Sequence, residues 1–308
     1  MRITAISLCP MSDAQKARLE ALGGLRYHDA VLGGPGMGEL CRGAEALVIT
    51  PRLSVDIVPF LDRCRFISVQ GAGTDALNVA AAREKGIVVS NVPDFCTDAV
   101  AEHAFSLLLG VAKRIAAGPP MLHAGAWTTA LAYTTVGLRG KTLGLLGCGK
   151  IGGRIAEIAR GFGMDVVATV RDPSKTRAVP AVRFHALLEQ SDFIVLAAPA
   201  TERTTGIFNA AAFARMKPQA ALINVSRAAL VNTADLLAAL DQGRLAAAAT
   251  DVFAPEPPAP GDPLLHHPKV LVSPHVAWGT EDALQRLLDL SIANVEAFAG
   301  GKPINVVS

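Results

Sequence analysis

A glycine-rich run near the middle of the chain constrains the fold more than any other feature. Residues 147–152 read GCGKIG and match the pattern G-x-G-x-x-G. A strand-like apolar stretch, Thr142–Leu146, precedes the run, and a helical pattern, Ile151–Phe162, follows it. In that setting the first glycine allows a tight turn, the second admits a pyrophosphate against the backbone, and the third lets helix and strand pack closely. The free N–H groups of the helix N-terminus then face the anion, so the run predicts a dinucleotide-binding turn.

The residues around this turn predict a parallel sheet. Six apolar runs are strand candidates: Thr142–Leu146, Val166–Val170, Phe193–Ala198, Ala221–Val225, Ala247–Val252 and Val270–Ser273. Helical patterns fit between most of them: Ile151–Phe162, Ala210–Met216 and Ala234–Leu240. Near-continuous apolar strands that alternate with helices are typical of a parallel sheet covered on both faces. We therefore predict an α/β fold with a Rossmann-type doubly wound sheet.

The N-terminal part repeats the alternation on a smaller scale. The strand candidates there are Arg2–Ser7, Ala46–Thr50, Phe66–Gln70 and Ile87–Asn91, and the helix candidates are Asp13–Leu22, Val55–Leu61 and Asp75–Lys85. A long buried helix is predicted over Asp98–Ile115, a loop follows it, and an amphipathic helix, Ala283–Gly300, ends the pattern. Glu102 and His103 lie on the long helix, where we expect a structural or interface role.

Length and composition exclude several classes of protein. The chain has 308 residues, enough for two domains of about 150 residues each. A hydrophobic fraction of 51% argues against disorder, and a net charge of +2 argues against a dedicated nucleic-acid binder. The longest stretch without Asp, Glu, Lys or Arg, Ile115–Leu138, contains glycines and prolines that would break a membrane-spanning helix. We expect a cytoplasmic protein with five reduced cysteines, no signal peptide and no metal site.

The residues after the second strand of the sheet bear on the choice of nucleotide. An NAD site usually has an acid about 20 residues after the glycines, which binds the ribose 2′-hydroxyl. That position falls near Val170, and Arg171 and Asp172 follow it. An arginine beside an uncharged strand end suits a 2′-phosphate, so we favour NADP. NAD stays possible, with Asp172 on the ribose.

Three polar residues follow later strands of the same series. Arg227, Glu256 and His275 each come shortly after a strand candidate. In an open parallel sheet the ligand crevice lies outside the carboxyl ends of the strands, so we expect the three to converge there.

With these motifs in place, the chain resembles the D-isomer-specific 2-hydroxyacid dehydrogenase family over essentially its full length. The segments that carry the resemblance are Gly71–Asp75, Gly86–Val89, Val100–His103, the glycine run, Asn224–Arg227, Asp251–Pro257 and Ser273–His275. The resemblance implies a smaller, flavodoxin-like α/β substrate domain formed by residues 1–96 and 284–308, into which the dinucleotide-binding domain, residues 97–283, is inserted.

The resemblance also implies roles for individual residues. Arg227 would bind the substrate, Glu256 would pair with the histidine, and His275 would donate or accept the proton. Further substrate contacts are expected from Ala72, Gly73, Phe95 and Trp278. The expected cofactor-binding residues are Thr97, Gly147, Gly149, Lys150, Ile151, Gly152, Arg171, Pro199, Thr204, Val225, Asp251 and Ala277.

General chemistry supports the three catalytic roles. Hydride transfer to a 2-oxo acid develops charge on the carbonyl oxygen, and a protonated imidazole beside it can deliver the proton. A neighbouring carboxylate favours the charged imidazole. A guanidinium can bind the substrate carboxylate and polarise the carbonyl at once.

The resemblance leaves the substrate open. The run His275–Trp278 looks most like glycerate dehydrogenases and hydroxypyruvate reductases, so hydroxypyruvate or glyoxylate is the expected substrate. A phosphoglycerate-type or bulkier 2-oxo acid is the alternative. A homodimer formed through the Asp98–Ile115 region is expected by resemblance. The alternative from another class is a non-catalytic, dinucleotide-sensing protein of the corepressor type on the same fold.

Overall fold

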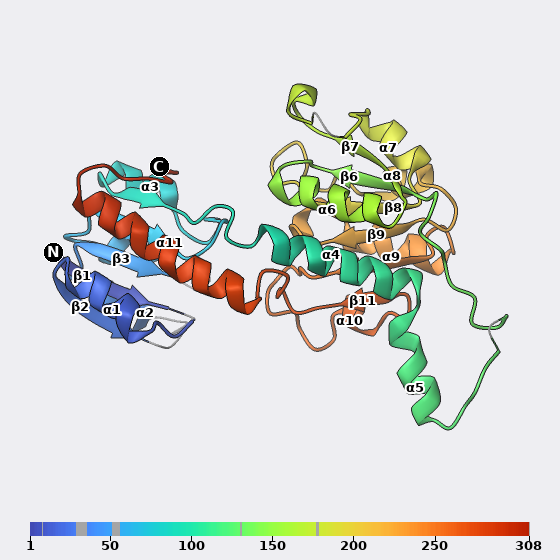
Figure 1. Cartoon of the computed structure of the whole chain (residues 1–308), viewed down its shortest axis with the longest axis horizontal. Coiled ribbons are helices and arrows are strands. Elements are labelled where there is room, and N and C mark those ends of the chain that lie inside the picture. The colour runs from blue at the N-terminus through green and yellow to red at the C-terminus, as the bar shows by residue number, and fades with distance from the viewer. Residues whose placement is uncertain (8, 29–35, 51–55, 130, 177–178, 308) are drawn as a thin grey trace. The chain divides into compact units, whose positions relative to one another are not determined.

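The chain forms two compact units in the computed structural model (Figure 1). The structure describes residues 1–7, 9–28, 36–50, 56–129, 131–176 and 179–307. Unit 1 comprises Met1–Cys96 and Gly279–Ser308, and unit 2 comprises Thr97–Trp278. The second boundary therefore falls at Gly279, a few residues before the expected position near residue 284.

Unit 1 is built on a five-stranded parallel sheet. Its strands are β1 (Arg2–Ile6), β2 (Gly24–His28), β3 (Ala46–Ile49), β4 (Phe66–Val69) and β5 (Val88–Ser90). The strand order is β2-β1-β3-β4-β5. This is the flavodoxin-like doubly wound order, in which ligands meet the sheet beyond the carboxyl ends of the strands.

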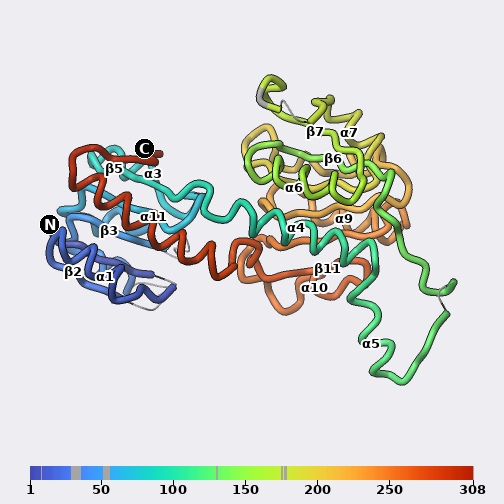
Figure 2. The backbone as a smooth tube through the Cα atoms, viewed as in Figure 1, coloured from blue at the N-terminus to red at the C-terminus, as the bar shows by residue number. Residues whose placement is uncertain are grey.

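Helices cover both faces of this sheet. They are α1 (Asp13–Glu20), α2 (Gly36–Cys41), α3 (Val79–Glu84) and α11 (Glu281–Ala299), with a short 3-10 turn, η1 (Val58–Phe60). One core holds Leu19 of α1 and Ile292 of α11 against β1, β3 and β4. The opposite core holds Met37 of α2 and Ala82 of α3. After α11 the chain returns beside β5, where Val306 bridges Ser90 (Figure 2).

Unit 2 is built on a six-stranded parallel sheet, as the sequence predicts. Its strands are β6 (Thr142–Leu146), β7 (Asp165–Thr169), β8 (Phe193–Leu196), β9 (Ala221–Asn224), β10 (Ala247–Thr250) and β11 (Val270–Val272). Their order is β11-β10-β9-β8-β6-β7. Alternate residues of β8 enter opposite cores, since Phe193 and Val195 face one side and Ile194 and Leu196 face the other.

Helices cover both faces of the unit 2 sheet. Helices α4 (Thr97–Ala112) and α6 (Lys150–Gly161) share a core with β6. Helices α7 (Phe184–Gln190), α8 (Ala210–Arg215), α9 (Thr233–Asp241) and the short α10 (Pro263–His266) share the opposite core. Leu107 and Leu108 of α4 are among the buried residues of the first core. Helix α4 is therefore a core helix of unit 2, as its wide apolar stripe predicts.

The order of the unit 2 strands reverses at β6, where the chain passes from β7 back across to β8. The glycine run occupies this point. A Cβ at Gly147, whose φ is 92°, would lie 2.7 Å from the carbonyl oxygen of Ala197, directly after β8. A Cβ at Gly152 would lie 2.4 Å from the carbonyl oxygen of Gly147. Only glycine therefore allows β6, α6 and the end of β8 to meet this closely.

Several local predictions are corrected by the structure. Strand β2 was not expected, because GLRYH lacks an apolar run; it lies at the sheet edge and pairs with β1 alone among the described strands. The predicted loop after α4 contains a 3-10 turn, η2 (Ile115–Ala117), and a helix, α5 (Gly118–His123). Its two prolines lie in the first helical turn, where no intrahelical N–H bond is lost. Of the predicted helix Val55–Leu61 only η1 forms, and Val55 lies outside the described residues.

A search of the described helices for one long and apolar enough to cross a membrane finds none.

Two neighbouring glycines of α6, Gly152 and Gly153, give a matched test of the close packing of α6 against the turn at Gly147. Gly152→Ala should lower the free energy of unfolding by about 1–3 kcal/mol, because the new methyl group overlaps the Gly147 carbonyl. Gly153→Ala should leave it unchanged or raise it by up to about 1 kcal/mol, because a Cβ there meets nothing within 4 Å and alanine favours the helix. Urea unfolding of both variants measures the difference. Equal stability of the two would contradict the close approach.

Candidate active site

The predicted catalytic residues lie at one edge of the unit 2 sheet. Arg227 follows β9, Glu256 lies in the segment after β10, and His275 follows β11. Because β9, β10 and β11 are parallel neighbours, their carboxyl ends open on the same side. The glycine run lies at the same edge, after β6.

His275 and Glu256 form a close pair. The distance from His275 Nδ1 to Glu256 Oε2 is 2.6 Å, and both side chains are about one-third exposed, at 32% and 33%. The other carboxylate oxygen, Oε1, accepts the backbone N–H of Phe253 at 3.0 Å, which holds Glu256 in place. A carboxylate can only accept here, so Nδ1 carries a proton and Nε2 is the ring nitrogen through which a proton can be exchanged.

The backbone at His275 is held in the left-handed region, with φ of 54°. This conformation is strained for a residue with a Cβ and costs about 1–3 kcal/mol. Hydrogen bonds to neighbouring groups hold the turn. The N–H of His275 donates to the Ser273 carbonyl at 3.1 Å, and Trp278 Nε1 donates to the His275 carbonyl at 3.1 Å. Asp251, next to this loop, accepts the N–H groups of both Val276 and Ala277.

Asp251 is buried and accepts hydrogen bonds from the loop that carries His275. Its Oδ1 accepts Val276 N–H at 3.0 Å and the Ser273 hydroxyl at 2.6 Å, and its Oδ2 accepts Ala277 N–H at 2.9 Å. His103 Nε2 lies 3.5 Å from Oδ1. Burial opposes ionisation, but the hydrogen bonds from these donors outweigh it and hold the pKa of Asp251 below its ordinary value. Asp251 therefore stays a carboxylate that clamps two consecutive amides.

Sequence reasoning missed the part of Ser273 in this arrangement and gave His103 only a general structural role. His103 Nε2 lies 2.8 Å from Ser273 Oγ, so a helix residue and a strand-end residue meet behind the His275 loop. The one available signal was Ser273 itself, a hydroxyl residue two positions before the predicted catalytic histidine.

Arg227 sits on a short turn fixed by Asn224. The Asn224 amide donates to the Arg227 carbonyl at 2.9 Å, and its oxygen accepts the Ser226 N–H at 3.0 Å. Arg227 Nη1 also donates to the Ser226 carbonyl at 2.9 Å. The guanidinium is thereby tied to the backbone at the end of β9.

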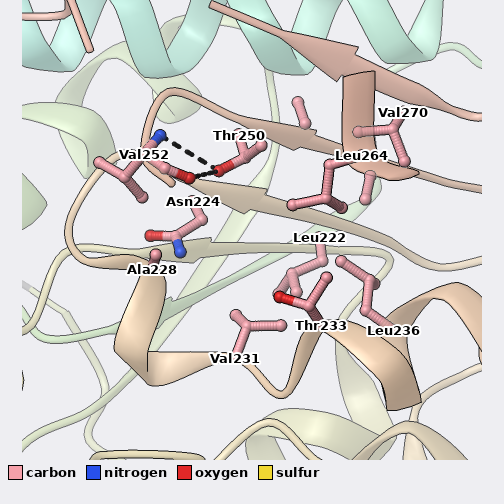
Figure 3. A pocket seen from close by; sticks show the side chains of 12 residues that line it. Leu222, Asn224, Ala228, Val231, Thr233, Leu236, Thr250, Val252, Leu264 and Val270 are labelled. Carbon is pink, nitrogen blue, oxygen red and sulfur yellow. Dashed lines mark hydrogen bonds between the residues drawn. The ribbon is translucent and has the colours of Figure 1, made fainter. Parts of the chain in front are cut away.

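A small cavity lies behind these strand ends (Figure 3). Asn224 and Ala228 line it, as does Thr250, which is paired with Asn224 on the neighbouring strand and hydrogen-bonded to Val252. Its volume is about 20 Å³ and its lining is mostly aliphatic. That is room for one water molecule, so this cavity is part of the core and is too small for a substrate.

The glycine turn fits a pyrophosphate. Helix α6 begins at Lys150, directly after the exposed Gly149, and Ile151 follows in the first turn. A Cβ at Gly149 would meet nothing within 4 Å, which leaves open space beside the N–H groups of the helix N-terminus. This is the geometry that an anion needs to approach the backbone.

The adenosine end of the predicted cofactor site lies after β7. Val170 is half-buried and packs on the core, and Arg171 is exposed. Asp172 Oδ1 accepts both the N–H of Ser174, at 3.1 Å, and its hydroxyl, at 2.7 Å. That oxygen therefore caps the next turn.

The remaining predicted cofactor residues lie around the same edge. Thr97 is the first residue of α4. Pro199 and Thr204 lie in the loop after β8, where the Pro199 carbonyl accepts the Thr204 hydroxyl at 2.8 Å. Val225 follows β9, and Ala277 is bound to Asp251.

The predicted substrate residues Ala72, Gly73 and Phe95 belong to unit 1. The Ala72 carbonyl accepts the Asn91 amide at 2.7 Å, and the Gly71 carbonyl accepts Val92 N–H at 2.9 Å. The loop after β4 is therefore fixed by the segment after β5. Phe95 is buried, with 5% of its surface exposed.

Within the described residues, no three His, Cys, Asp or Glu side chains are grouped so that they could hold a metal ion.

Comparison with known proteins identifies the family. Residues 105–277 match the family described as D-isomer specific 2-hydroxyacid dehydrogenase, NAD binding domain. A glyoxylate reductase of Thermococcus litoralis is 36% identical over 88% of this chain and 85% of its own length. A hydroxypyruvate reductase of Blautia hydrogenotrophica is 34% identical over 79% of this chain and 78% of its own length.

A solved structure shares the whole fold. It is an acyclic imino acid reductase in complex with NADPH and D-Arg, which superposes with a TM-score of 0.92 at 25% identity over 100% of both chains. The family match and the two relatives show that the chain binds a nicotinamide cofactor and catalyses NAD(P)-dependent 2-hydroxyacid oxidoreduction. The chain therefore belongs to the D-isomer-specific 2-hydroxyacid dehydrogenase family.

Proposed function

We propose that this enzyme reduces hydroxypyruvate or glyoxylate to the corresponding 2-hydroxy acid. The observation that carries the catalytic assignment is the 2.6 Å pair of His275 and Glu256, at the sheet edge where Arg227 also lies. The names of the relatives support the substrate class, since one is named a glyoxylate reductase and the other a hydroxypyruvate reductase.

In this mechanism Arg227, His275 and Glu256 have different tasks. Arg227 binds the substrate carboxylate and polarises the carbonyl, because a guanidinium presents donors in a fork that matches a carboxylate. The bound nicotinamide supplies the hydride. His275 gives its Nε2 proton to the carbonyl oxygen as negative charge develops there, and Glu256 stabilises the imidazolium through Nδ1.

Each unit carries some of the predicted binding residues. Unit 2, with the glycine turn and the three catalytic side chains, would bind the cofactor. The loop of unit 1 that contains Ala72 and Gly73 would hold the substrate carboxylate through backbone N–H groups. The way in which Asn91 and Val92 fix that loop supports this assignment.

Removal of the proposed acid tests the function. His275→Ala should lower kcat for hydroxypyruvate or glyoxylate at least about a hundredfold, the usual scale of general acid catalysis. The exposed His185→Ala, on α7, is the control and should keep wild-type kcat. Steady-state rates would be measured with hydroxypyruvate, glyoxylate, pyruvate, 2-oxoisocaproate and phenylpyruvate.

Three outcomes would overturn parts of this proposal. Near wild-type turnover in His275→Ala would refute the role of the histidine. Absence of turnover by the wild-type protein on every oxo acid would instead favour the dinucleotide-sensing alternative. A clear preference for 2-oxoisocaproate or phenylpyruvate would change the proposed substrate class without contradicting the mechanism.

NADP is the proposed cofactor. Arg171 is exposed beside the uncharged end of β7, and one oxygen of Asp172 is occupied by Ser174. The similar structure that holds NADPH is in keeping with this choice.

The role of Arg171 can be measured directly. Arg171→Ala should raise the KM for NADPH about tenfold or more, because a hydrogen bond to a charged group contributes roughly 1.5–3 kcal/mol. The KM values for NADH and the oxo acid should stay within about twofold. Arg215→Ala, at an arginine paired with Glu189, is the control. A wild-type preference for NADH would refute the NADP proposal.

A homodimer is the proposed assembly. The stretch that follows α4 exposes large apolar side chains: Ile115 at 62%, Leu122 at 49%, Trp127 at 88% and Leu131 at 90%. Ile115, Leu122 and Trp127 line a groove of about 460 Å³ together with residues that include Lys113, Met121 and Tyr133. Apolar surface of this extent is typical of an interface. A second copy of the chain, bound through this stretch and α4, would cover it.

Light scattering tests the assembly. The wild-type protein should have the mass of a dimer, and the double substitution Trp127→Glu and Leu131→Glu should shift it to monomer, because two charges cannot be buried without partners. A monomeric wild type would refute the proposal.

A further inference from the structure

His103 and Ser273 form a connection between the core of unit 2 and the loop that carries His275. His103 lies on α4, 170 residues before Ser273 in the sequence, yet its Nε2 lies 2.8 Å from Ser273 Oγ. The Ser273 hydroxyl in turn donates to Asp251 Oδ1 at 2.6 Å. Asp251 binds the two amides that follow His275.

The donor and the acceptor can be assigned for both hydrogen bonds of the series His103–Ser273–Asp251. Asp251 is a carboxylate and can only accept, so the single hydroxyl proton of Ser273 points to it. Ser273 Oγ can then only accept from His103, and His103 Nε2 must carry a hydrogen. The order of donors is therefore His103 to Ser273 to Asp251.

Close packing holds α4 in position for this contact. A Cβ at Gly110 would lie 2.7 Å from Leu271 Cδ2, so the absence of a side chain lets α4 approach β11. Gly110 is seven residues, about two turns, after His103 and lies on the same face of the helix. His103 is thus presented to the end of β11 by a helix of the core rather than by a loop.

We propose that His103 is a positioning residue for the catalytic histidine and acts through Ser273 and Asp251. The left-handed backbone at His275 is strained and needs hydrogen bonds that hold it. His103 fixes the Ser273 hydroxyl, and that hydroxyl fixes the Asp251 carboxylate in the orientation that binds Val276 and Ala277. The inference rests on the proposed role of His275 as the acid.

Two substitutions at His103 separate this role from simple packing. His103→Gln keeps an N–H donor close to the position of Nε2, whereas His103→Leu keeps bulk and removes the donor. We expect His103→Leu to lower kcat about tenfold or more and to change the KM for NADPH less than about twofold. His103→Gln should recover most of kcat. Thermal unfolding of each variant would be recorded beside the rates.

A measurement that needs no turnover follows the loop itself. Hydrogen exchange of the peptide containing residues 273–278 should become at least about tenfold faster in His103→Leu, because the amides of Val276 and Ala277 lose their fixed acceptor. His103→Gln should exchange at close to the wild-type rate. If the proposed function fails, this measurement still tests the positioning of the loop.

A double-variant cycle tests whether His103 acts through Ser273. Ser273→Ala removes the linking oxygen without touching α4, and it also serves if His103→Leu does not fold. In kcat, the double variant His103→Leu and Ser273→Ala should lose no more than about twofold beyond the stronger single variant. Losses that multiply would show independent roles and overturn the proposal. Unchanged kcat and exchange in both His103→Leu and Ser273→Ala would overturn it as well.

Discussion

Parallel pairing of the unit 2 strands is the constraint on which the rest of the site depends. Six strands that run in one direction bring all their carboxyl ends to one edge, so segments far apart in sequence open on the same side. The glycine turn, Arg227, Glu256 and His275 each follow a different strand of this sheet. At the point where the strand order reverses, Gly147 and Gly152 leave no room for a Cβ beside the neighbouring backbone. The parallel sheet thus brings these segments to one edge, and the turn after each strand provides the functional groups.

Asp251 fixes the conformation of the loop that carries His275. Its buried carboxylate accepts two backbone amides and a hydroxyl, and these bonds compensate for the cost of burying a charge. The same bonds hold the left-handed turn at His275, whose Nδ1 lies 2.6 Å from Glu256 Oε2. His103 connects this arrangement to α4, a helix of the core, so the loop that carries His275 is tied to the packing of unit 2.

The sequence predicted the elements with strong local patterns and missed those without them. All six unit 2 strands were expected, because each contains a run of mostly apolar residues, and β8 and β9 are buried at every position. Strand β2 was missed, because an edge strand is half-exposed and carries Arg26 and Tyr27 among few apolar residues. Helix α5 was missed, because Pro119 and Pro120 signal a break wherever their position within a helix is unknown.

By itself the sequence determined the fold class, the family and the residue types of the candidate site, because the glycine spacing, the apolar periodicity and the segments around Arg227, Glu256 and His275 are local properties of the chain. Only the tertiary structure decided which groups meet. The contact of His103 with Ser273 spans 170 residues, and the choice of Val276 and Ala277 as partners of Asp251 depends on how β10 and β11 lie side by side. Long-range contacts of this kind leave no periodic trace in a single sequence, since they arise from packing between elements rather than from the propensity of any one of them.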